Sequence, residues 1–147
     1  MTLKQLLDTI GDMGIKQKLI RFSAAGTSLA QLNPMTIDSY PFLFSSPTGT
    51  HQIKQDVKIF DLTLYYCDRL LEDYSNDIDI LSSSIENLQN LINGIKQVPG
   101  VVDVESVYAI RNFASTEKMN DRLAGAYANV KITVANSSTC YIEPDAE

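Results

Sequence analysis

The sequence predicts an α+β domain in which two helices pack on one face of a mostly antiparallel sheet of four to five strands. Two segments have the apolar spacing of amphipathic helices, and four or five have the alternation of strands. Their order is helix, three strands, helix, two strands. Because each helix has a single apolar face, both should cover the same side of the sheet. A chain of 147 residues fits one such core, so we expect a single domain over residues 1–147.

The first predicted helix runs from Thr2 to about Met13. Thr2 is a suitable N-cap, and we expect Gly11 and Gly14 to end the helix. Its leucines and isoleucine follow the spacing i, i+3, i+4, i+7 and should face the core: Leu3, Leu6, Leu7 and Ile10.

Three strand candidates follow, at residues 18–26, 39–46 and 56–70. Pro41 restricts the second to a sheet edge or to the start of a strand, and a turn-rich loop from Ser46 to Gln52 separates it from the third. The third is the longest, and its even-numbered face is the more apolar. We expect these even-numbered residues to meet the core: Phe60, Leu62, Leu64 and Tyr66.

The second predicted helix covers residues 76–98 and ends at Pro99-Gly100. Asp77 and Asp79 lie in its first turn, where negative charge suits the helix dipole. An apolar stripe is expected to face the sheet: Ile78, Leu81, Ile85, Leu88, Leu91, Ile92 and Ile95.

Two strands complete the predicted sheet. In the first, residues 101–110, one face is expected to carry Val102, Val104, Tyr108 and Ile110. A polar connection over 111–121 leads to the last strand, residues 123–135. The apolar face of this strand changes from three alanines to three β-branched residues, which we interpret as close approach of the long helix over the alanines. Residues 140–147 are expected to form a flexible tail.

Composition narrows the function classes. A net charge of −6 and a pI of about 4.7 argue against a dedicated nucleic-acid binder. We find neither a signal peptide nor an apolar run of the ~18 residues that span a membrane, so a soluble intracellular protein is expected. Cys67 and Cys140 fit no metal spacing and are expected to be free thiols.

Catalytic signatures are weak. His51, the only histidine, lies in the turn-rich loop, and no nucleophile motif or phosphate-binding glycine loop occurs. Asp77 and Asp79 form an Asp-x-Asp that helix capping explains better than Mg²⁺ or Ca²⁺ binding. We therefore expect no catalytic, cofactor or metal site, and a protein that is not an enzyme.

The remaining candidates concern surfaces. The pairs Asp68-Arg69 and Asp121-Arg122 fit either local ion pairs or contacts with a neighbouring chain. The face of the sheet opposite the helices mixes apolar side chains with charged ones, which fits either a protein contact or an ordinary surface. That face contains Ile59, Tyr65, Val107 and Tyr127 beside Asp61, Thr63, Asp103, Glu105 and Lys131. The candidate subunit-interface residues are His51, Tyr65, Asp68, Arg69, Asp121, Arg122, Tyr127 and Lys131.

Three stretches also carry a resemblance: "YPFLF" at 40–44, "LYYCDRLLEDYSNDIDILSSSIENLQNLI" at 64–92, and "DRLAGAYANVKITV" at 121–134 with one cysteine after it. Together with the element order, they resemble neck or connector ring proteins of crAss-like and related tailed phages. The order is also similar to the tail-terminator and tail-completion fold. The resemblance covers roughly residues 2–142.

This resemblance implies a structural virion protein in the phage neck or tail, assembled in the host cytoplasm. Such proteins form rings of six or twelve copies between the portal and the tail, in contact with the portal, other neck rings and tail proteins. The sheet and its long loops, 44–56 and 111–121, would supply much of the ring interface. Genome DNA would pass through the ring without specific binding. The alternatives are a small α+β binding or adaptor domain outside a virion, or a small hydrolase or transferase with a site that the sequence does not reveal.

Overall fold

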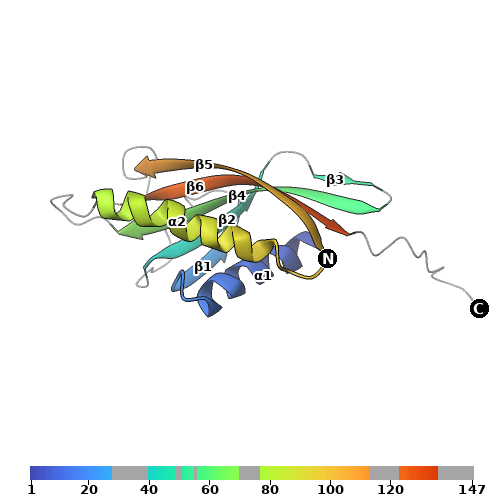
Figure 1. Ribbon diagram of the computed structural model, residues 1–147, viewed down its shortest axis with the longest axis horizontal. Helices are drawn as coiled ribbons and strands as arrows, with labels where there is room; N and C mark the ends of the chain where they lie inside the picture. Colours follow the sequence, from blue (N-terminus) through green and yellow to red (C-terminus); the bar gives the residue numbers. More distant parts are fainter. Residues whose placement is uncertain (28–39, 49–50, 55, 70–76, 113–122, 136–147) are drawn as a thin grey trace, which may run out of the picture.

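The computed structural model describes residues 1–27, 40–48, 51–54, 56–69, 77–112 and 123–135. Two helices pack against a mixed, mostly antiparallel sheet of five ordered strands, which confirms the predicted α+β class. Figure 1 shows both helices in front of the sheet. The elements are α1 (Leu3–Lys16), β1 (Phe22–Ala25), β2 (Phe42–Pro47), β3 (Gln52–Ile53), β4 (Val57–Arg69), α2 (Asp77–Ile95), β5 (Val101–Asn112) and β6 (Leu123–Ala135).

The strand order in the sheet is β1-β2-β4-β6-β5. Strand β1 is parallel to β2, and the other pairs are antiparallel. The centre is formed by β4 and β6, which pair along their whole length from Val57↔Ala135 to Arg69↔Leu123. The two-residue strand β3 pairs with the start of β4. The sequence predicted only a turn-rich loop up to Gln52, so this short hairpin was missed.

The core lies between the sheet and the two helices. As predicted, the even-numbered side chains of β4 face it, as do the alanines and β-branched residues of β6. Ile80 and Leu81, near the start of α2, pack with Ala124 at the alanine end of β6. This contact agrees with the predicted approach of the long helix to that end of the strand.

Helix α1 is longer than predicted. Its N-terminus is capped by Thr2 as expected, in a reciprocal arrangement with Gln5. The prediction that Gly11 and Gly14 end the helix is wrong, because both are buried inside it. A Cβ atom on Gly14 would lie 2.9 Å from Cδ1 of Ile20, so a small residue lets the following turn fold back closely. The helix ends at Lys16, and β1 starts only at Phe22.

Two apolar residues lie outside the core, contrary to prediction. Ile78 is 70% exposed, and Ile80 takes its place in the buried stripe of α2, followed by the buried Ser84. The Ser84 hydroxyl donates to the carbonyl oxygen of Ile80, which allows a polar side chain in that stripe. Val102 is 64% exposed because β5 has a register shift between Val101 and Asp103.

No helix in the described part of the chain is long and apolar enough to cross a membrane. The predicted connection at 113–121, the predicted tail at 140–147 and the pair Asp121-Arg122 lie outside the described residues.

Candidate interaction surface on the helix-free face

The side of the sheet away from α1 and α2 is the helix-free face. Successive strand residues point to opposite faces, so the odd-numbered residues of β4 and β6, and those of β5 from Asp103 onward, belong to it. The pairing of the three strands arranges these residues in rows that run across the sheet. Neighbouring rows differ in chemistry, from charged through polar to aromatic.

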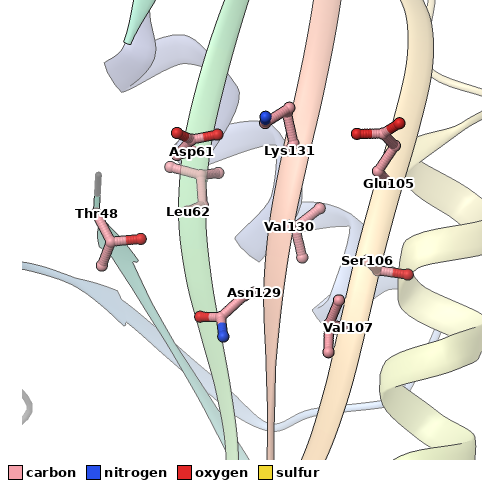
Figure 2. Close-up of a pocket in the computed structure, with 9 residues that line it drawn as sticks. All are labelled: Thr48, Asp61, Leu62, Glu105, Ser106, Val107, Asn129, Val130 and Lys131. Carbon is pink, nitrogen blue, oxygen red and sulfur yellow. The ribbon is translucent and has the colours of Figure 1, made fainter. Parts of the chain in front are cut away.

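The charged row consists of Asp61, Lys131 and Glu105. Lys131 is the cross-strand partner of Asp61 on one side and of Glu105 on the other. Lys131 and Glu105 are exposed, and Asp61 is half-buried. The central lysine therefore lies between two carboxylates, an arrangement in which cross-strand neighbours attract. Figure 2 shows the three side chains at one level on three strands.

The polar row is held by hydrogen bonds. The Thr63 hydroxyl, almost fully buried, donates to Oδ1 of Asn129 at 2.9 Å. The hydroxyls of Thr48 and Thr63 lie 3.2 Å apart in a second hydrogen bond. Val107, the cross-strand neighbour of Asn129 on β5, is 69% exposed. The exposed side chain of Val107 thus lies beside a cluster of hydrogen-bonded polar side chains.

The aromatic row consists of Phe44, Tyr65 and Tyr127. The ring centroids of Tyr65 and Tyr127 are 6.0 Å apart, and those of Phe44 and Tyr65 are 6.3 Å apart. These separations lie in the range of favourable aromatic pairs. Phe44 is fully buried, while both tyrosines are half-buried. The predicted interface residues Tyr65 and Tyr127 are therefore direct neighbours.

The charged and polar rows line an open depression of about 550 Å³. Its floor is formed by β4, β6 and β5, and Figure 2 shows side chains from all three strands around it. The residues that line it are Thr48, Asp61, Leu62, Glu105, Ser106, Val107, Asn129, Val130 and Lys131. Lys131 was predicted as an interface residue. The part played by Thr48 and Asn129 was not, because it depends on strand register.

The other predicted interface residues lie away from the depression. The ring of the exposed His51 is 5.4 Å from that of Phe60, centroid to centroid, in an edge contact. Asp68 lies near the end of β4, and its Oδ1 accepts a hydrogen bond from the backbone N–H of Arg69 at 2.8 Å. Burial raises the pKa of Asp68, although this hydrogen bond and the charge of Arg21 oppose the shift. Asp121 and Arg122 are not among the described residues.

Within the described ranges, no three His, Cys, Asp or Glu side chains gather closely enough to hold a metal ion. Asp79 is exposed in the first turn of α2. Cys67 is buried.

Comparison of the sequence with protein-family models and with curated proteins finds no match.

Proposed function

We propose that the protein is a non-enzymatic structural subunit that forms a ring in the neck or tail of a tailed phage. In this role it assembles with copies of itself and contacts the portal, other neck rings and tail proteins. The observation that carries the proposal is the helix-free face, where an open depression exposes Val107 beside charged and hydrogen-bonded side chains. Such a mixture of apolar, aromatic and charged groups suits contact with another protein.

The pattern of burial supports contact through this face. The helices already cover the opposite face, and Thr63 and Asn129 are fixed by their hydrogen bond. A surface whose polar groups are fixed in advance loses less side-chain entropy on association. The depression is also broad and open rather than a closed cleft for a small ligand, so it fits a protein surface.

The acidic charge fits a conduit for DNA. With a net charge of −6, each copy repels phosphate groups overall, and a ring multiplies that charge by the number of copies. Because such a wall does not attract phosphate groups, genome DNA would pass through the ring without binding to it. The proposal also draws on the resemblance to ring proteins of the phage neck and tail, which rests on the sequence stretches and on the order helix–three strands–helix–two strands predicted from them.

Native mass spectrometry tests the proposal, with negative-stain electron microscopy of the same sample. Purified protein is measured at micromolar concentration, alone and mixed with the portal protein encoded in the same genome. We expect a closed ring of six or twelve copies with a central channel. A monomer under both conditions would overturn the proposal. Capture of a non-virion protein by that monomer would favour the adaptor alternative.

A further inference from the structure

We infer that the hairpin formed by β3 and the start of β4 docks on the helix-free face of a neighbouring copy, with Ile53 placed beside Val107. This inference rests on the self-assembly proposed above and names the two surfaces that meet. It commits to a second copy of this chain as the occupant of the depression.

The hairpin presents an apolar side chain with no cover. Its turn is closed by a hydrogen bond from the Lys54 N–H to the carbonyl oxygen of Val57, at 2.8 Å. Ile53, next to this turn, is 75% exposed, the highest exposure among the large apolar residues of the described chain. In Figure 1, β3 and the start of β4 reach past the ends of both helices. An apolar group on a projecting hairpin gains stability when a partner removes it from water.

The depression offers a matching receptor. Val107 is exposed at its edge, and Glu105 and Asp61 supply two carboxylates against the single ammonium of Lys131. The hairpin has the opposite balance, because residues 52–58 contain two lysines, Lys54 and Lys58, and one acidic residue. One docking arrangement therefore brings Ile53 against Val107 and places the lysines of the hairpin near the carboxylates of the depression.

The two surfaces belong to opposite sides of the sheet. Ile53 is in register with Lys58, an even-numbered residue of β4, which places it on the helix side. Val107 is in register with Asn129 and, through it, with Thr63 on the helix-free face. A contact between unlike surfaces leaves one hairpin and one depression free on every dimer. Addition of copies then continues until the ring closes.

The contact cannot form within one chain. On β4, Ile53 lies opposite Lys58, and Val107 is level with Thr63 through Asn129. These two positions of β4 are five residues apart, or about 16 Å at ~3.3 Å per residue. A disulfide requires Cα atoms within about 7 Å. A disulfide between cysteines at positions 53 and 107 would therefore join two copies.

Cysteine cross-linking tests the inference. Ile53→Cys and Val107→Cys are combined in one chain, in a Cys140→Ser background that keeps the buried Cys67. After mild oxidation, denaturing electrophoresis should show a ladder of covalent oligomers, and mass spectrometry should map the 53–107 disulfide. A matched control carries Ile78→Cys with Val107→Cys, because Ile78 is 70% exposed but lies on α2. We expect at least tenfold less cross-linked product from this control.

Three outcomes would overturn the inference, and native mass spectrometry of the same samples shows which of them also contradicts the proposed function. Intact rings without the 53–107 disulfide would reject the hairpin contact and leave the ring proposal standing. A predominant link between two copies of position 107 would show a two-fold contact of the helix-free faces. Protein that stays monomeric before and after oxidation would contradict both proposals.

Discussion

The Asn87 side chain donates a hydrogen bond from Nδ2 to the hydroxyl of Tyr66 at 2.9 Å and so links α2 to β4. The same hydroxyl donates to the carbonyl oxygen of Leu19 at 3.2 Å, in the turn between α1 and β1. Tyr66 is almost fully buried, and this burial raises the pKa of its hydroxyl. One phenol therefore ties α2 and the turn after α1 to β4, a central strand of the sheet that carries the helix-free face.

Replacing Tyr66 with phenylalanine should lower the free energy of unfolding by about 1–3 kcal/mol, because the Asn87 amide and the Leu19 carbonyl lose their partner. Urea denaturation measures the change. Tyr108→Phe, at a half-buried position of the same sheet, is the control. Adding Asn87→Leu to Tyr66→Phe should recover part of the loss. Equal effects of Tyr66→Phe and Tyr108→Phe would contradict the assigned link.

Gly125→Ala should destabilise the fold, because a Cβ atom at this position of β6 would lie 1.8 Å from the backbone oxygen of Tyr66. Backbone atoms of a central strand cannot move aside easily, so we expect a loss of about 1–3 kcal/mol or more. Gly94→Ala on α2 makes the same chemical change next to the flexible side chains of Met13 and Gln17, and alanine favours a helix. Thermal denaturation should show a clear loss for the first variant and little or none for the second.

The periodic parts of the sequence predicted most of the fold. The bounds of β6 and the core faces of β4 and β6 follow from alternation, because burial of one sheet face requires it. Two local departures from the predicted fold could not be recognised from the periodicity of the sequence. Gly14 was predicted to end α1 but lies inside it, where the absence of a side chain lets Ile20 approach closely. The bulge that exposes Val102 depends on how β5 pairs with β6.

The candidate surface could be predicted only in part. Its residue types and its side of the sheet followed from the alternation of β4, β5 and β6. The rows could not be predicted from alternation. The register of the strand pairs places Lys131 between Asp61 and Glu105, and Asn129 opposite Thr63. The projecting hairpin was missed because two residues of β3 are too few to show a period.

Ala126→Phe should unfold the domain or reduce its stability severely. Ala126 is fully buried on the face of β6 that meets the helices, and overpacking there typically costs about 1–3 kcal/mol or more. Ala135→Phe, at the exposed end of the same strand, is the matched control and should leave stability nearly unchanged. Circular dichroism with urea titration compares the two, and a stable, soluble Ala126→Phe protein would reject the assigned orientation of β6.

Asp68→Asn should stabilise the protein increasingly as pH rises from 3 to 7. The raised pKa means that the folded state binds the carboxyl proton more tightly than the unfolded chain, whose value is near 3.8. The contribution of Asp68 to the free energy of unfolding of the natural protein therefore falls as pH rises through the folded pKa. Asparagine keeps the oxygen that accepts from Arg69 but does not ionise. Urea titrations across this range, with the exposed Asp103→Asn as control, should show a growing advantage of Asp68→Asn; a constant or shrinking difference would contradict the burial effect.

Val107→Asp should weaken self-association without unfolding the domain. The side chain is 69% exposed, so the substitution leaves the core intact, but in the proposed contact it places a carboxylate against Ile53 and beside Glu105. Loss of the apolar contact, about 1.5 kcal/mol for a valine, already corresponds to more than tenfold in affinity. Val102→Asp, at a similarly exposed valine of the same strand, is the matched control. Sedimentation velocity over a concentration series should show dissociation for Val107→Asp alone, and equal association of both variants would place the subunit contact elsewhere on the molecule.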